Sequence, residues 1–264
     1  MIDLFSKLLG LPPIAAEYGG EVDRLIIYIH WLMLALFVGW FSYFLYAIWR
    51  FNAKRNPKAD HHGVRSHISS YMELAIVVVE VFLLVAFAIP MWGFASDVTR
   101  LKDKDKAGAV TIHIVAQQFQ WNVRYPGKDG QFGKQDMKFI TDANLFGVNT
   151  NDPAGLDDVQ ISPAPQIHLP VGKACIVYLT SKDVIHSFKV IAMRVTQDAI
   201  PGIRIPTWFK PTKEGMYQIN CAQLCGVGHS AMSGGFIVVE SQEKYDAWLA
   251  SKASGASGAT ESVE

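Results

Sequence analysis

Two long apolar segments near the start of the chain constrain its fold more than any other feature. Residues 25–49 contain no Asp, Glu, Lys or Arg, and residues 74–94 contain one charged residue, Glu80. About 20 helical residues span the hydrocarbon core of a bilayer, so each segment is long enough to cross it. Helices of a soluble core are the alternative, but neither segment shows a polar face. The pattern therefore predicts a two-helix transmembrane hairpin over residues 25–96.

The loop between these segments indicates how the hairpin is oriented. Its charged residues up to position 65 are Arg50, Lys54, Arg55, Lys58, Asp60 and Arg65. Because cytoplasmic loops carry an excess of Lys and Arg, this loop is expected on the inner side of the membrane. Residues 1–24 show no signal-peptide pattern and are interpreted as an N-terminal outer segment. Everything after about residue 96 is expected outside as well.

After the hairpin, the sequence changes to short runs of β-forming residues separated by Gly, Pro, Asn and Asp. This pattern favours an all-β sandwich or barrel, predicted over residues 107–250. Residues 126–165 form an unusually long connection, and residues 251–264 have the composition of a flexible tail. The seven candidate strands cover residues 110–116, 119–125, 166–169, 175–180, 187–193, 216–220 and 235–240.

Composition excludes some classes of protein. The 24 basic and 24 acidic residues cancel, so net charge gives no indication of nucleic-acid binding. Three cysteines are too few for a small scaffold built on disulfides. Cys175 lies in an apolar run and is interpreted as a core thiol.

The chemistry is concentrated in one short segment near the end of the predicted domain. Cys221, Cys225, His229 and Met232 lie within 12 residues, directly after a candidate strand. Thiolate, imidazole and thioether are soft or borderline ligands, a combination that suits copper. His186 opens an earlier strand, and in a sandwich a strand end and a later loop can meet at the same pole.

Three other kinds of site use part of this ligand set. Cys221 and Cys225 could form a disulfide in an oxidising compartment. A structural zinc site would leave Met232 unused. A mononuclear blue-copper site needs only one thiolate and would leave Cys225 without a role. Two thiolates, two histidines and one Met fit two copper ions better.

At this point the chain resembles a known family. The segment Cys221-Ala-Gln-Leu-Cys225-Gly-Val-Gly-His229-Ser-Ala-Met232 and the upstream Asp183-Val-Ile-His186-Ser are similar to the CuA motif of cytochrome c oxidase subunit II. The resemblance extends over about residues 25–245. It implies an N-terminal transmembrane helical hairpin followed by a cupredoxin-like sandwich.

The resemblance also implies a set of copper ligands. Cys221 and Cys225 would bridge two copper ions. His186 and Met232 would complete one copper site, and His229 with the main-chain carbonyl of Gln223 would complete the other. No residue of the chain is expected to be catalytic in its own right.

The function implied is electron transfer in a respiratory haem-copper oxidase of a bacterial inner membrane, with the copper domain on the periplasmic side. Electrons would come from cytochrome c, a membrane-bound c-type cytochrome or a quinol-oxidising complex, and would pass to haem in subunit I. Subunit III is a further expected partner. Oxygen reduction and proton translocation would occur in the partner subunits. The chain contains no Cys-x-x-Cys-His, so no attached haem is expected.

Three positions depart from the family pattern or extend it. Gln223 replaces a Glu that binds magnesium at the subunit I interface, so magnesium near Gln223 and Asp198 is doubtful. Phe119 replaces the Trp through which electrons enter, whereas Trp121 is retained. Glu73 matches an acid at the start of a proton pathway.

Glu80 remains open to two interpretations. A carboxyl group inside a membrane helix is either protonated or paired with a residue of subunit I, and the sequence does not distinguish these states.

Other functions share part of the pattern. Thioredoxin-like copper chaperones have Cys-x-x-x-Cys on a βαβ core, unlike this all-β domain. Quinol oxidase subunits lack the copper ligands. Nitrous-oxide reductase needs a large His-rich domain that this sequence does not contain.

Overall fold

The computed structural model describes residues 2–58, 61–63, 66–142 and 144–257. The chain divides into two compact units. One contains Met1–Leu11 and Gly20–Gly93, and the other contains Pro12–Gly19 and Phe94–Glu264.

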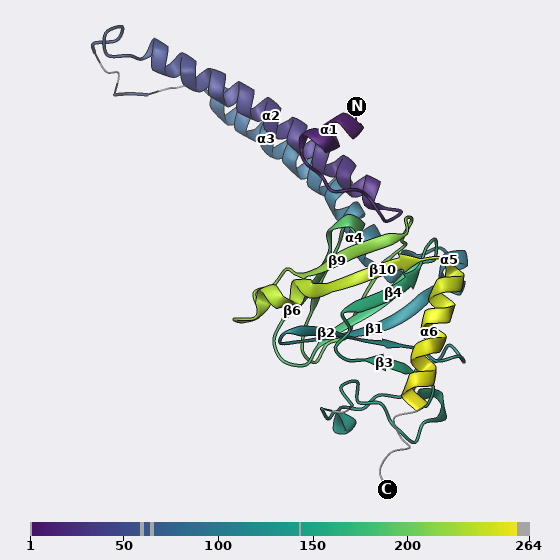
Figure 1. Ribbon diagram of the computed structural model, residues 1–264. Helices are drawn as coiled ribbons and strands as arrows, with labels where there is room; N and C mark the ends of the chain where they lie inside the picture. Colours follow the sequence, from purple (N-terminus) through teal and green to yellow (C-terminus); the bar gives the residue numbers. More distant parts are fainter. Residues whose placement is uncertain (1, 59–60, 64–65, 143, 258–264) are drawn as a thin grey trace. The chain divides into compact units, whose positions relative to one another are not determined.

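The first unit is helical (Figure 1). After the short α1 (Ile2–Leu8), the long helix α2 (Gly19–Arg50) contains the first apolar segment. The second forms α3 (Ile68–Leu83), a π-helical stretch η1 (Leu84–Ala88) and α4 (Ile89–Ser96) without interruption. Both helices are long and apolar enough to cross a membrane, and few or none of the residues in their most apolar segments are buried. The two predicted helices are therefore confirmed, with ends a few residues beyond the apolar runs.

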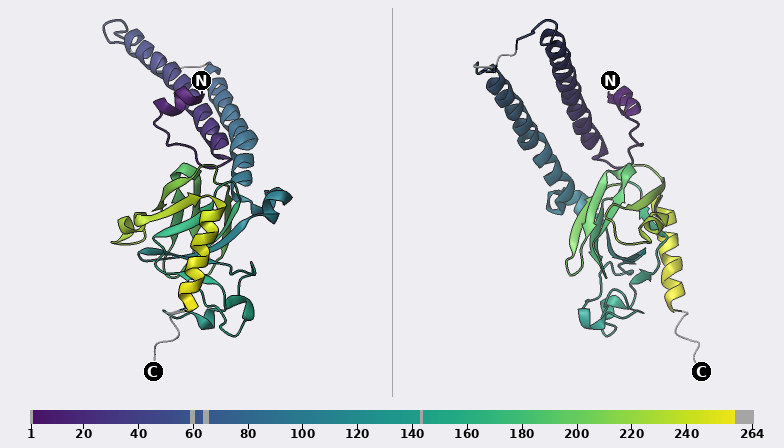
Figure 2. Two further views of the ribbon diagram at one scale, coloured as in Figure 1. Left: turned by 45° about the vertical axis from the view of Figure 1, so that its right-hand side comes forward. Right: turned by 90° about the vertical axis from the view of Figure 1, so that its left-hand side faces the viewer.

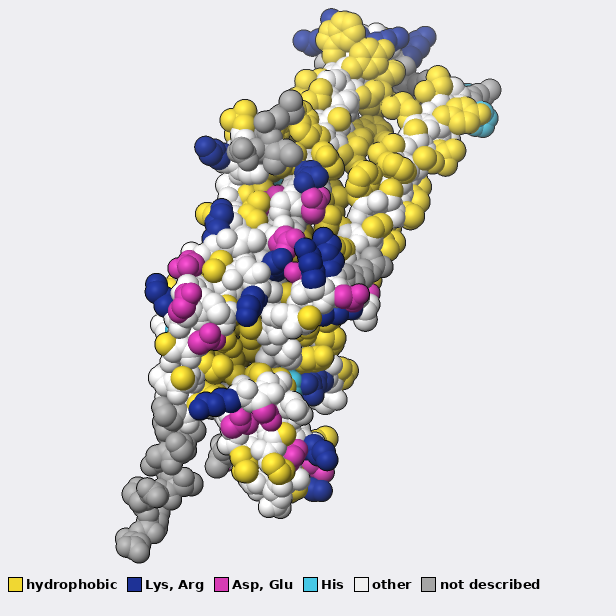
Figure 3. Space-filling view, turned by 90° about the vertical axis from the view of Figure 1, so that its right-hand side faces the viewer, with side chains coloured by type: hydrophobic (Ala, Val, Ile, Leu, Met, Phe, Trp, Pro, Cys, Tyr) yellow, Lys and Arg dark blue, Asp and Glu magenta, His cyan; other side chains and the backbone are white. Residues whose placement is uncertain are grey.

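The surface of the helices differs from that of the second unit. Hydrophobic side chains cover the helices, whereas Lys, Arg, Asp and Glu are distributed over the rest of the molecule (Figure 3). Basic side chains also gather at the end that carries the loop between α2 and α3 (Figure 3). This distribution matches a lipid-facing surface with a basic loop at one end.

The second unit is a sandwich of two five-stranded sheets, counted over the described part of the chain (Figure 1 and Figure 2). One sheet has the order β3-β2-β1-β5-β8. Its strands are β1 (Val110–Gln117), β2 (Gln120–Tyr125), β3 (Val159–Ile161), β5 (Cys175–Ser181) and β8 (Ile205–Phe209).

The other sheet has the order β4-β10-β9-β6-β7. Its strands are β4 (Gln166–Pro170), β6 (His186–Val190), β7 (Val195–Ala199), β9 (Gly215–Cys221) and β10 (Gly235–Glu240). The pairs β1–β5 and β10–β4 are parallel, and the other pairs are antiparallel. The predicted cupredoxin-like sandwich is confirmed.

The core lies between the sheets and follows the alternation of side chains along each strand. In β5, every second residue from Cys175 is buried, including Val177 and Leu179. Since neighbouring side chains of a strand point to opposite faces, this alternation places one face of β5 in the core. Phe188 and Phe209 are also fully buried and contribute large apolar area.

Three strands were not predicted from the sequence, and each lacks a strong strand pattern. β3 has only three residues, β7 has exposed polar residues, and β8 contains Pro206. The predicted strand 187–193 is in fact β6 followed by a 3-10 turn, Ile191–Met193. The 3-10 segments η2 (Val98–Arg100), η3 (Met137–Phe139) and η4 (Pro153–Gly155) lie in connections.

Two helices of this unit were also missed. The short α5 (Asp103–Ala107) precedes β1, and α6 (Gln242–Ser257) lies alongside the sandwich near β3 and β4 (Figure 2). Trp248 of α6 stacks on His168, with 4.1 Å between ring centroids. The helix continues into the segment predicted as a flexible tail, and residues 258–264 lie outside the described part.

The long connection after β2 is attached to the sandwich by a buried ion pair. The side chains of Arg124 and Asp158 are both completely buried and form a salt bridge. Asp158 also accepts a hydrogen bond from the Gly133 N–H (3.0 Å), and Arg124 donates to the Gly133 carbonyl (2.9 Å). The two ends of the connection are therefore held together at its base.

A buried histidine lies beside this ion pair. His113 of β1 is 4% exposed, stacks on Phe132 with centroids 3.9 Å apart, and accepts a hydrogen bond from Arg204. Burial, followed by the charges of Arg204 and Arg124, lowers the pKa of His113 to about 3. The folded domain therefore holds the neutral imidazole.

This lowered pKa predicts a pH-dependent stability. Below about pH 6.5 an unfolded histidine binds a proton that folded His113 does not, so its contribution to stability is lost as the pH falls toward 3. The slope is about 1.4 kcal/mol per pH unit within that window. Denaturant unfolding of the full chain in detergent between pH 7 and 4, compared with His113→Phe, measures this slope. Equal slopes for the two proteins would contradict the assignment.

Candidate metal centre

The register of β6 and β9 brings two distant parts of the chain together. In this antiparallel pair, Phe188 lies opposite Cys221. His186, the first residue of β6, is two positions from Phe188 and so points to the same face of the sheet. Cys221 is the last residue of β9, and the chain then forms a loop that leads into the 3-10 helix η6 (His229–Gly234).

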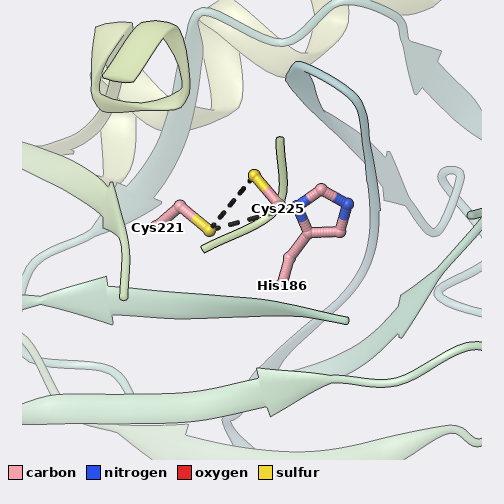
Figure 4. Close-up of side chains that lie close together, drawn as sticks. All are labelled: His186, Cys221 and Cys225. Atoms are coloured by element: carbon pink, nitrogen blue, oxygen red, sulfur yellow. Dashed lines mark hydrogen bonds between the residues drawn. The ribbon is translucent and has the colours of Figure 1, made fainter. Parts of the chain in front are cut away.

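The donor atoms of five predicted ligands lie close together. The Cys221 and Cys225 sulfurs are 4.0 Å apart, and the Cys221 sulfur is 4.0 Å from His186 Nδ1 (Figure 4). His229 Nδ1 is 3.4 Å from the Cys225 sulfur. Met232 Sδ lies 3.1 Å from His186 Nδ1 and 3.5 Å from the Cys225 sulfur. His186, Cys221 and Cys225 form a group able to hold a metal ion.

A main-chain oxygen also reaches this cluster. The carbonyl of Gln223 accepts a hydrogen bond from the Cys221 thiol at 3.1 Å, whereas the Gln223 side chain is exposed. All six predicted ligands therefore meet at one end of the sandwich, formed by the start of β6, the end of β9, the following loop and η6.

The cluster is largely closed to water. His186, Met232, Cys225 and Cys221 are all buried, whereas His229 is half-buried. Burial, followed by the neighbouring Cys221 sulfur, raises the pKa of the Cys225 thiol to about 11. Two adjacent thiolates repel each other when they are buried. The two thiols can therefore both ionise only when cations are bound beside them. The thiols, imidazoles and thioether fit copper chemically.

His186 is oriented by a neighbouring carboxylate. Its Nε2 meets Asp183 Oδ1 at 2.8 Å, which leaves Nδ1 facing the sulfurs. Burial alone would raise the pKa of Asp183, but hydrogen bonds from the Gln118 N–H, His186 and the Val184 N–H outweigh it and lower the pKa. Carboxylates commonly hold metal-binding histidines in this way. Asp183 was absent from the predicted site, although it stands three residues before His186.

The two aromatic residues predicted for electron transfer both lie near the cluster. Trp121 of β2 is buried, and its indole N–H donates to the Met232 carbonyl at 2.9 Å. The Phe119 ring lies so close to Gly228 that a Cβ there would come within 2.4 Å of it. Phe119, Trp121 and Met232 line a shallow apolar groove of about 170 Å³, together with Pro163 and Pro165.

The remaining predicted residues lie elsewhere. Asp198 is exposed on β7, opposite Ser187, and none of the contacts of the described residues joins it to Gln223. Glu73 is exposed in α3. Glu80, also in α3, lines a small groove with Leu32, Leu36, Ala75, Ile76 and Val79.

The structure describes all three cysteines, and each of them is a buried free thiol. Cys175 is buried in β5, away from the cluster, and burial raises its pKa. A disulfide between Cys221 and Cys225 is not present.

Comparison with known proteins identifies the family. The sequence profile described as cytochrome c oxidase subunit II, periplasmic domain, matches residues 110–242. The chain belongs to the cytochrome c oxidase subunit II family. As a subunit II, it is a component of a respiratory haem-copper oxidase, and its two apolar helices and periplasmic-type domain fit a membrane subunit. The family resemblance found in the sequence is therefore confirmed.

Curated relatives of this subunit II extend the match over most of the chain. It is 32% identical to the alternative cytochrome c oxidase subunit 2 of Bradyrhizobium diazoefficiens, over 90% of this chain and 82% of the relative. Identity to cytochrome c oxidase subunit 2 of Cereibacter sphaeroides is 30%, over 91% and 78% of the two chains. The solved periplasmic domain of Bradyrhizobium japonicum subunit II (CoxB) has 30% identity and a TM-score of 0.40, over 55% of this chain and 94% of that one.

Proposed function

We propose that this subunit holds two copper ions in a CuA centre, accepts electrons one at a time from a c-type cytochrome and passes them to haem in subunit I. The hairpin would anchor it in a bacterial inner membrane, with the copper domain in the periplasm and subunits I and III as neighbours. The observation that carries this proposal is the meeting of two thiols, two imidazoles, one thioether and one carbonyl oxygen at one end of the sandwich.

The positions of the donors favour two metal ions over one. The two sulfurs lie side by side, and each has a different histidine near it: His186 beside Cys221, and His229 beside Cys225. Met232 lies nearer His186, while the Gln223 carbonyl contacts Cys221. One tetrahedral ion would use only four of these six groups.

The fold itself holds several of these donors in place. His186 pairs with Ala199 of β7, and Cys221 pairs with Phe188 of β6. The Trp121 indole holds the main chain at Met232. Held by Cys221 and Cys225, two copper ions would share one unpaired electron, so that metal–ligand bonds would change little when an electron is added. A buried, rigid ligand set keeps the rearrangement small, because neither side chains nor water need to move far.

Copper content and electron paramagnetic resonance test this proposal directly. The full chain is expected to hold two copper ions and to give a seven-line hyperfine pattern when oxidised. Cys225→Ser should abolish that pattern, because a hydroxyl is a poor bridging ligand for copper. Cys175→Ala, at a buried cysteine away from the cluster, is the matched control and should keep both coppers. One copper per fully loaded wild-type chain would refute the proposal.

Phe119 bears on the identity of the electron donor. We propose that Phe119 and Trp121 lie where electrons enter, and that the donor is a dedicated or membrane-bound c-type cytochrome, or a quinol-oxidising complex. Phe119 keeps an apolar contact surface but lacks the indole N–H of a Trp. Its half-buried ring borders the groove next to Met232, which supports an apolar contact surface beside this proposed ligand.

The prediction for Phe119 concerns turnover of the purified oxidase. Mitochondrial-type cytochrome c should support only slow turnover, and Phe119→Ala should change that slow rate little. Phe119→Trp should raise it while leaving copper content unchanged. Rapid turnover of the wild type that is lost in Phe119→Ala would instead assign a soluble, generic donor.

Gln223 sets the expectation for magnesium. We propose that tight magnesium binding is lost at this position, because a neutral amide is a weaker ligand than a carboxylate for a hard cation. Asp198, the acid predicted for the same magnesium site, lies on β7 and has no contact with Gln223 among the described residues. Glu73 is proposed as the start of a proton pathway.

Metal analysis of the purified complex tests the magnesium proposal. The wild type should contain no stoichiometric magnesium, and Gln223→Glu should gain one tightly held ion. Gln218→Glu serves as the control and should gain none, because Gln218 is an exposed residue of β9 whose amide bonds to the Ser233 carbonyl and to none of the predicted ligands. Stoichiometric magnesium bonded to the wild-type Gln223 side chain would contradict the proposal.

A further inference from the structure

Gln118 joins the two parts of the chain that carry the candidate ligands. It lies in the two-residue turn between β1 and β2. Its backbone N–H donates to Asp183 Oδ2 at 2.7 Å, and its side-chain Nε2 donates to the Cys225 carbonyl at 2.6 Å. The two acceptors are far from Gln118 and from each other in the sequence, so this turn bridges separate segments.

On one side, the bridge reaches a histidine ligand. Asp183 uses Oδ2 for Gln118 and Oδ1 for His186 Nε2, at 2.8 Å. The same Oδ1 accepts from the Val184 N–H at 2.7 Å, and the Ser181 hydroxyl lies 3.3 Å away. With this many partners, the carboxylate cannot rotate without breaking several hydrogen bonds, and the imidazole is held with it.

On the other side, the bridge reaches the loop after Cys221. This loop has little packing of its own, since Leu224 is 79% exposed and Val227 is fully exposed. Gly226 has φ +135°, a conformation that favours glycine, and a Cβ there would lie 2.9 Å from Gln118 Nε2. The amide therefore fits against a position where only glycine leaves room, and its hydrogen bond fixes the peptide that follows Cys225.

We infer that Gln118 is a positioning residue for the metal centre, which sets the placement of the Cys225 sulfur relative to His186. This assignment rests on the proposed copper-binding function. Gln118 contacts none of the atoms that are proposed to bind copper. It acts through the Cys225 main chain and through Asp183. Loss of its side-chain hydrogen bond leaves the Cys225 carbonyl without this donor, while the Phe119 ring of the same turn still packs against Gly226 and Gly228.

The experiment makes the same substitution at two glutamines of the β1–β2 hairpin. Gln118→Met keeps the length of the side chain but removes the donor without adding charge. Gln120→Met is the matched control, because the Gln120 amide bonds to Asn122 and Ser162 rather than to the copper loop. Gln118→Asn keeps an amide on a shorter side chain and tests partial rescue. All chains are full-length, purified in detergent and loaded with copper.

Three measurements separate positioning from a general effect on folding. Copper affinity, measured by competition with a chelator, should fall about 10- to 100-fold in Gln118→Met, the range usual for groups that orient metal ligands. The copper hyperfine pattern and the reduction potential of Gln118→Met should also differ from those of the wild type. The unfolding midpoint of the metal-free chain should stay close to that of Gln120→Met, and Gln118→Asn should lie between wild type and Gln118→Met in affinity.

Each other outcome overturns the assignment. If Gln118→Met keeps wild-type affinity, spectrum and potential, Gln118 does not position the ligands, while the copper pair of the wild type stands. If only the unfolding midpoint falls, the role is structural. If Gln120→Met changes the copper hyperfine pattern as much as Gln118→Met does, the effect belongs to the β1–β2 hairpin as a whole. A wild-type chain without a copper pair refutes the proposed function, and this assignment with it.

Discussion

The close approach of two buried sulfurs is the constraint on which this domain depends. At 4.0 Å, Cys221 and Cys225 cannot both ionise without a cation between or beside them. The surrounding structure supplies what such a cation would need: an imidazole near each sulfur, a thioether, and a main-chain oxygen. The β6–β9 register carries His186 to this place, so the sheet determines the composition of the site.

The ligand-bearing segment could be predicted from the sequence because four of its side chains lie within 12 residues and share a preference for soft metals. The helices were equally clear, since apolar length alone indicates a membrane span. The bridge through Gln118 could not be predicted, because its hydrogen bonds connect residues 65 and 107 positions apart. β8 was missed because Pro206 weakens a strand pattern, although this strand lies at a sheet edge where proline is tolerated.

At Gln223 and Phe119, the departures from the family pattern change no donor atom of the cluster. Gln223 contributes a main-chain oxygen to the cluster, and this oxygen does not depend on the side chain. Phe119 borders the groove beside Met232 but contributes no donor atom. Substitutions at these positions can therefore change what the subunit contacts, while the buried sulfurs and imidazoles keep their arrangement.

The burial of Met232 affects how readily its thioether is oxidised. A thioether is converted to its sulfoxide by peroxide, and the reaction is faster where the sulfur is reached by solvent. Met232 is 1% exposed, whereas Met137, in the long connection after β2, is 82% exposed. Peroxide formed near a working oxidase therefore reaches Met137 first. Burial thus shields the Met232 thioether from this oxidation, whereas the Met137 thioether is open to it.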